Sequence, residues 1–94
     1  MIQKAFKLYN KKYGSRAQII KAVEELSELQ TVLCRYLNLD SGEVRPEIAN
    51  QIIDEIADVE IMTEQLKMIF KIEKNVLICK DVKIDRMINR INGI

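Results

Sequence analysis

Two short acidic clusters hold the residues whose types and spacing could do chemistry. The first is the segment Glu24-Glu25-Leu26-Ser27-Glu28, and the second is Glu55-Ile56-Ala57-Asp58. Each cluster pairs carboxylates three residues apart within a strongly helical stretch, so each pair projects from one side of its helix. If the two helices pack together, four carboxylates converge, and such a group is costly to keep ionised without a cation. Ligands that are all oxygen atoms suit Mg²⁺, with Mn²⁺ as the alternative.

A helical projection distinguishes the members of these clusters. Glu55 falls inside the apolar arc of its helix, and Asp58 lies at the edge of that arc. Glu25 borders the apolar face of the other helix, Glu28 is one step further out, and Glu24 is on the far side. Three other acids point elsewhere and are interpreted as solvated charges: Asp54, Glu60 and Glu64. An ion pair or a solvated face explains any one acid equally well, but the matched set favours a metal because few bases lie nearby.

The absence of histidine narrows the chemistry of the site. The sequence contains no His, which excludes the Glu-x-x-His di-iron bundles and argues against zinc. No calcium-loop pattern, glycine-rich phosphate loop or Ser-His-Asp set is present either. Magnesium and manganese ions held by oxygen ligands usually act on phosphates, so the acidic clusters predict phosphate chemistry.

A basic row near the end of the chain fits the same chemistry. Lys83, Arg86 and Arg90 are spaced by three and four residues beside an apolar stripe. Bases at the border of a core can reach an acidic, metal-filled cleft and bind phosphate oxygens, so Lys83 and Arg86 are candidate phosphate ligands. The alternative is a solvated helix end, where the helix dipole favours basic side chains.

The elements that must position these residues are helical. The sequence predicts a single all-α domain over residues 1–94, with four helices at about 2–13, 16–39, 46–71 and 75–91. Gly14 suits the end of the first helix, and Pro46 suits the first position of the third. The segment Asp40-Ser41-Gly42 predicts a turn, and Asn75 could cap the fourth helix.

Composition sets the size and setting of this domain. Ninety-four residues with 48% hydrophobic content and no Trp predict a small aliphatic core that is completed by oligomerisation. The net charge of +1 provides no general field for nucleic acid or membrane. Cys34 and Cys79 are interpreted as buried, reduced side chains. Because no signal-peptide run or membrane-spanning stretch is found, we expect a cytoplasmic protein.

The two motifs together resemble a known family. Glu24-Glu25-x-x-Glu28 followed by Glu55-x-x-Asp58 is similar to the signature of the MazG-like, all-α nucleoside triphosphate pyrophosphohydrolases. That superfamily also includes dimeric dUTPases, dCTP pyrophosphatases and phosphoribosyl-ATP pyrophosphohydrolases. The resemblance extends from about Tyr13 to Arg86, with residues 18–26 resembling the approach to the first motif and Lys83-x-x-Arg86 the basic pair after the second.

The resemblance implies a four-helix bundle, completed as a dimer or tetramer, that cleaves nucleoside triphosphates between the α- and β-phosphates. It implies four Mg²⁺ ligands: Glu25, Glu28, Glu55 and Asp58. Glu24 would be a catalytic carboxylate that supports the site and orients water, and Lys83 and Arg86 would stabilise the leaving pyrophosphate. Gln18 and Lys21 are candidate substrate contacts, with helix capping and solvation as the equally good alternatives.

Two classes of function therefore stay open. The first is a Mg²⁺-dependent nucleotide pyrophosphohydrolase that removes aberrant or surplus nucleotides, with a specialised dUTP or dCTP enzyme as a close variant. Hydrolysis of phosphoribosyl-ATP is less expected, because nothing in the sequence marks that substrate. The second class is a non-catalytic helical interaction or regulatory module, in which the acids only solvate helix faces.

Overall fold

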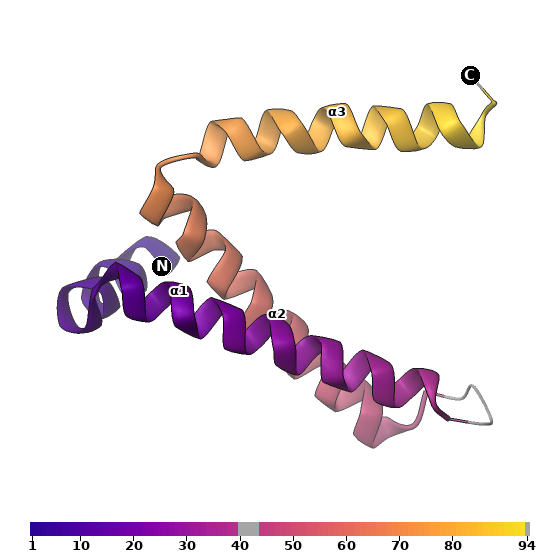
Figure 1. Ribbon diagram of the computed structural model, residues 1–94, viewed down its shortest axis with the longest axis horizontal. Helices are drawn as coiled ribbons and strands as arrows, with labels where there is room; N and C mark the ends of the chain where they lie inside the picture. Colours follow the sequence, from indigo (N-terminus) through magenta and orange to yellow (C-terminus); the bar gives the residue numbers. More distant parts are fainter. Residues whose placement is uncertain (40–43, 94) are drawn as a thin grey trace.

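The computed structural model describes residues 1–39 and 44–93, which form three α-helices and no β-strand (Figure 1). The helices are α1 (Ile2–Leu37), α2 (Pro46–Phe70) and α3 (Glu73–Ile91). The chain leaves α1 and returns along α2, so these two helices pack as an antiparallel hairpin, whereas α3 extends away from it (Figure 1). The all-α prediction is confirmed, and the predicted turn at 40–42 lies outside the described residues.

The predicted break at Gly14 is present, but the two segments that it separates join without a loop into α1, so the four predicted helices appear as three elements. Residues on both sides of Gly14 are helical, and α1 bends there because Gly14 has φ 83° and ψ 162°. This conformation is almost exclusive to glycine, since a Cβ atom would clash with the neighbouring backbone. The Ser15 hydroxyl donates a hydrogen bond to Asn10 Oδ1 at 2.9 Å, which ties the two segments of α1 together across the bend.

The start of α2 follows the prediction, whereas the start of α3 does not. Pro46 occupies the start of α2, as predicted, where its missing N–H costs no helical hydrogen bond. The helix ends at Lys71, which adopts a left-handed conformation with φ 56° and ψ 48°. The chain then enters α3 at Glu73, with Ile72 at the cap position and no capping side chain. Asn75 therefore lies inside the first turn of α3, and the prediction that it caps the helix is wrong.

The seam between α1 and α2 is small and partly polar. Ala22 and Val32 are the buried apolar side chains among the described residues. Three polar or charged side chains are buried with them: Gln18, Glu25 and Gln65. Within the described residues, no helix combines the length and apolar character needed to cross a bilayer. The hairpin thus positions polar groups along its seam with little aliphatic packing around them.

Helix α3 packs against very little of the hairpin. It contacts α2 near the turn that joins them, does not pack against α1, and has no buried residue. Cys79 lies on this exposed helix, and Cys34 lies on an outer face of α1. Both thiols are free and exposed, so the prediction that they are buried is wrong for the single chain. The apolar surroundings in sequence do not bury Cys79, because its helix has no packing partner in this chain.

Replacing Gly14 tests whether the bend in α1 is a structural requirement. We expect Gly14→Ala to lower the free energy of unfolding by about 1–3 kcal/mol, because alanine is strained at this φ and ψ. Urea unfolding followed by circular dichroism measures the change. Gly93→Ala is the control, since Gly93 also has a positive φ but follows the last helix. Equal stability of Gly14→Ala and the parent protein would contradict a required bend.

Candidate metal centre

Carboxylates from α1 and α2 meet at the helix seam. One carboxylate oxygen from each of Glu25, Glu28 and Glu55 lies within 4.8 Å of the other two. A second group, formed by Asp54, Glu55 and Asp58, meets the same distance limit. The two groups share Glu55, so the four predicted ligands and Asp54 together form two overlapping triads. We call the five residues of these triads the acidic cluster.

Two oxygen atoms of the acidic cluster are buried and have no partner. Glu25 is only 5% exposed, and Glu55 is half-buried. Glu25 Oε2 and Glu55 Oε2 are shielded from solvent and accept no hydrogen bond within the part of the chain that the structure describes. An unpaired buried carboxylate oxygen is destabilising, and a bound cation would compensate it. The donor set is oxygen from carboxylates alone, so it fits Mg²⁺ or Mn²⁺.

The electrostatics of the cluster are repulsive. Burial is the largest cause that raises the pKa of the Glu55 carboxyl, followed by the negative charges of Glu28 and Asp58. Burial also raises the pKa of Asp58, followed by the charges of Glu25 and Asp54. In both groups, burial and the neighbouring negative charges disfavour the ionised carboxyl.

One base does reach the cluster. Lys21 Nζ lies 3.0 Å from Glu25 Oε1, four residues along the same helix, and 3.9 Å from Glu24 Oε2. The hydrogen bond to Glu25 raises the pKa of Lys21, so the ammonium stays charged. The ion-pair explanation thus accounts for one oxygen of Glu25. It does not account for Glu25 Oε2 or for Glu55, which have no such partner among the described residues.

Asp54 is a cluster member that the helical projection missed. Its side chain is exposed, in agreement with its interpretation as a solvated charge. Its carboxylate nevertheless lies within 4.8 Å of ligand atoms on Glu55 and Asp58. The available signal was the four-residue spacing of Asp54 and Asp58, which places two acids on neighbouring turns of one helix face.

The remaining predicted site residues fall into two groups. Glu24 is exposed and is the neighbour of Glu25 in the chain. Gln18 is buried and Lys21 is exposed, and both line one cavity. Lys83 and Arg86 are exposed on α3, which does not pack against α1. Within the described residues they form no ion pair with the acidic cluster, so a single chain does not bring them to it.

Comparison of the chain with protein-family models, with curated proteins and with solved structures gives no match. Function is therefore inferred from the acidic cluster and from the surfaces around it.

Unfolding experiments with and without metal test the cluster. Because the pKa of Glu55 is raised above its ordinary value of 4.5, the folded state binds more protons than the unfolded state just above that pH. The contribution of this group to stability is therefore greatest at low pH and is lost as pH rises. We expect the metal-free protein to lose stability through this group as pH rises above about 4.5, and Glu55→Gln to flatten that dependence.

Addition of Mg²⁺ at pH 7.5 should raise the unfolding midpoint of the parent protein, because the ion binds the folded state alone. Thermal scans in EDTA and in millimolar Mg²⁺ measure this. Glu60→Gln, which changes an exposed acid of α2 outside the cluster, should keep the full response. An identical Mg²⁺ response in the parent and in Glu55→Gln would contradict a metal centre at this place.

Proposed function

We propose that the chain is a Mg²⁺-dependent pyrophosphohydrolase of nucleoside or deoxynucleoside triphosphates. It would cleave between the α- and β-phosphates, releasing a nucleoside monophosphate and pyrophosphate, and would remove aberrant or surplus nucleotides. The observation that supports it most directly is the pair of unpartnered buried oxygens, Glu25 Oε2 and Glu55 Oε2, inside a group of converging carboxylates. The order and spacing of the two acidic motifs, which resemble the MazG-like signature, name the reaction class.

The residues that would hold the ion are the predicted ligands, with one addition: Glu25, Glu28, Glu55 and Asp58, together with Asp54. When bound, Mg²⁺ would neutralise triphosphate charge and make water more acidic near the α-phosphate. Glu28 and Asp54 are exposed, so the cluster opens to solvent on one side, where a phosphate chain can approach. Glu25 is the buried member of the cluster.

The resemblance to the MazG-like signature assigns the role of handling water to Glu24. Its side chain is 58% exposed, and it sits next to Glu25 in the chain, on the solvent side of the helix. In the proposed reaction the oxygen of a water molecule attacks the α-phosphorus, and Glu24 orients that water and accepts its proton. The bond from the α-phosphorus to the bridging oxygen breaks, and the electron pair leaves with pyrophosphate.

Self-association is part of the proposal, because the single chain leaves too much surface uncovered. Its accessible surface is 7719 Å², against about 5,600 Å² for a compact monomer of 10.9 kDa. Its radius of gyration is 16.7 Å, against about 12 Å for a compact chain of 94 residues. The excess surface of about 2,100 Å² is in the range that one chain buries in an obligate oligomer.

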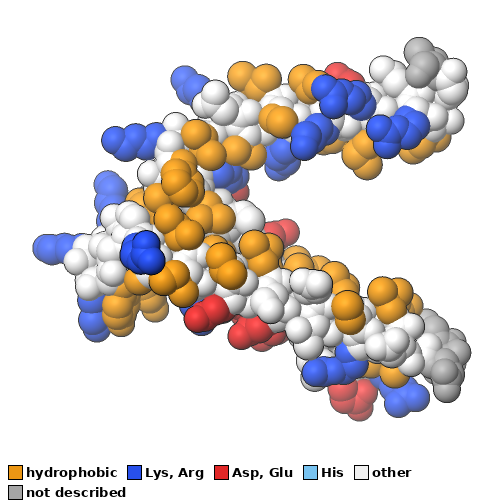
Figure 2. Space-filling view, viewed as in Figure 1, with side chains coloured by type: hydrophobic (Ala, Val, Ile, Leu, Met, Phe, Trp, Pro, Cys, Tyr) orange, Lys and Arg blue, Asp and Glu red, His pale blue; other side chains and the backbone are white. Residues whose placement is uncertain are grey.

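The character of the exposed surface supports the same conclusion. Apolar side chains follow both the hairpin and α3 in the space-filling view (Figure 2). Large exposed apolar residues occur on all three helices, including Val23, Leu26, Ile53, Ile56, Leu77, Ile78, Met87 and Ile88. An uncovered amphipathic helix and apolar faces of this extent mark an interface. We therefore propose a dimer or tetramer in which the helices of several copies form the bundle.

This assembly also offers a place for the basic pair. Lys83 and Arg86 are exposed on α3, away from the acidic cluster of their own chain. If α3 covers the apolar surface of a second copy, its bases can reach the acidic cluster of that copy. There they would bind the phosphates and stabilise charge on the leaving pyrophosphate.

A hydrolysis assay tests the reaction. Purified protein is incubated with common and deaminated NTPs and dNTPs, with Mg²⁺ or with EDTA, and pyrophosphate and monophosphate are measured. We expect release that requires Mg²⁺ and falls by about 100-fold or more in Glu55→Gln, because the ion loses a ligand shared by both triads. Glu60→Gln should retain parent activity. Absence of hydrolysis with every nucleotide tested would favour the helical interaction module instead.

A mixing experiment tests whether α3 of one copy serves the site of another. Glu55→Gln chains and chains with both Lys83→Ala and Arg86→Ala should each be at least about tenfold less active than the parent. The two variants are then unfolded together and refolded as an equal mixture. If acids and bases come from different copies, one site in four combines intact groups, and activity returns to about a quarter of the parent value.

The control is each variant refolded alone, with light scattering to record the oligomer mass. Recovery in the mixture requires sites built from two copies. A mixture that stays at the level of its components, or a monomeric parent protein, would contradict shared sites.

A further inference from the structure

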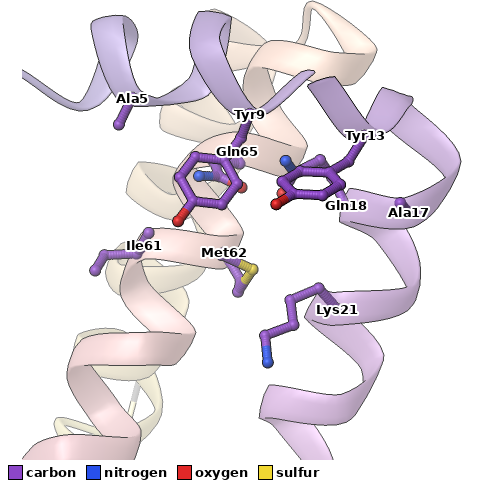
Figure 3. A pocket seen from close by; sticks show the side chains of 9 residues that line it. All are labelled: Ala5, Tyr9, Tyr13, Ala17, Gln18, Lys21, Ile61, Met62 and Gln65. Carbon is purple, nitrogen blue, oxygen red and sulfur yellow. The ribbon is translucent and has the colours of Figure 1, made fainter. Parts of the chain in front are cut away.

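A cavity lies between α2 and the two segments of α1 that meet at Gly14 (Figure 3). Its volume is about 490 Å³, which is within the range of small-molecule sites. The residues of its wall that matter here are Tyr9, Tyr13, Gln18, Lys21 and Gln65. The bend at Gly14 creates this space, because it places the first segment of α1, with its two tyrosines, beside α2.

Two buried amides make the cavity polar at one point. Gln18 is 5% exposed and Gln65 is 4% exposed, and both line the cavity from facing helices. Gln65 Oε1 is shielded from solvent and has no hydrogen-bond partner among the described residues. A buried carbonyl oxygen left unpaired is destabilising. Because the last torsion of a glutamine is soft, the amide can turn to meet a donor that enters the cavity.

Two aromatic rings lie on the other side of the cavity. The centroids of Tyr9 and Tyr13 are 5.7 Å apart, and their planes are inclined by 36°. Each tyrosine is 54% exposed, and in the view of Figure 3 the ring of Tyr9 overlaps Gln65 while the ring of Tyr13 overlaps Gln18. Exposed rings next to buried amides suit a flat ligand that stacks on the rings and hydrogen-bonds through its edge.

One side chain joins this cavity to the acidic cluster. Lys21 lines the cavity, and its Nζ pairs with Glu25 Oε1 at 3.0 Å. A ligand that occupies the cavity and extends past Lys21 therefore reaches the cluster. A nucleotide has this arrangement, with its base in the cavity and its phosphates at the carboxylates.

We propose that this cavity binds the nucleobase of the substrate, an inference that rests on the proposed function. Tyr9 and Tyr13 stack against the base. Gln65, assisted by Gln18, forms hydrogen bonds with an edge of the base on which an N–H donor lies beside an acceptor. Such an edge satisfies the unpaired Oε1 and the amide N–H₂ of one glutamine together. An apolar surface of a second copy would leave that oxygen unpaired, so the amides distinguish a base site from a subunit contact.

Nucleosides without phosphate, added without metal, isolate the cavity from the acidic cluster. The ¹⁵N-labelled protein in EDTA is titrated with uridine, thymidine, cytidine, adenosine, guanosine and inosine, and the side-chain amide signals of Gln18 and Gln65 are followed by NMR. At least one nucleoside should shift both signals. Gln65→Leu should weaken its binding about tenfold, and an analogue methylated at the pairing N–H should bind about as weakly.

Matched variants complete the test. Gln30→Leu, on α1 outside the cavity, should bind like the parent, and Gln65→Leu should remain folded because it removes a buried unpaired oxygen. The inference is overturned if no nucleoside shifts the two amides, or if Gln65→Leu binds as well as the parent.

Glu55→Gln separates this inference from the proposed function. It should bind the nucleoside normally while lacking hydrolysis, since Glu55 does not line the cavity. Nucleoside binding without any hydrolysis by the parent would overturn the enzyme and keep the base site. Hydrolysis by the parent without nucleoside contact at the amides would overturn the base site and keep the enzyme.

Discussion

The packing of α1 against α2 depends on the carboxylates that lie between them. Ala22 and Val32 bury little apolar surface, so the seam has few contacts with which to offset charge repulsion. Burial and neighbouring acids raise the pKa values of Glu55 and Asp58, and one Lys21 ammonium cannot balance the whole cluster. A cation at this position would offset the repulsion and link the two helices.

The rest of the chain also leaves much of its apolar surface exposed. Helix α3 has a hydrophobic face but no partner for it, and the hairpin exposes apolar side chains along both helices. These surfaces and the separation of the bases on α3 from the acids of the hairpin have one common explanation in the proposed assembly of several copies. In that assembly, stability and completion of the site would arise from the same contacts, as a second chain would supply both apolar cover and phosphate-binding bases.

Local sequence rules predicted the helical segments and the convergence of acids well where the physics is local. Pro46 starts a helix because its ring presets φ, and Gly14 marks the bend because only glycine adopts that conformation without strain. Glu25 and Glu55 face the seam because side chains repeat every three to four residues along a helix. The rules failed for Asn75, since α3 begins at Glu73 without a capping side chain, and for the burial of Cys79, because burial depends on what packs against α3.

The sequence by itself determined the helical class, the bend and the helix faces that carry the acidic motifs, because these follow from residues a few positions apart. Only the tertiary structure decided which turns of α1 and α2 meet. That contact brought Glu25 and Glu28 of α1 to Glu55 of α2, and it left Glu25 Oε2 and Glu55 Oε2 without partners among the described residues. It also brought Gln65 opposite the tyrosines of α1, residues more than 50 positions apart in the chain, which no periodicity relates. The physical reason is that packing between helices depends on the complementarity of whole surfaces, whereas helix formation depends on near neighbours.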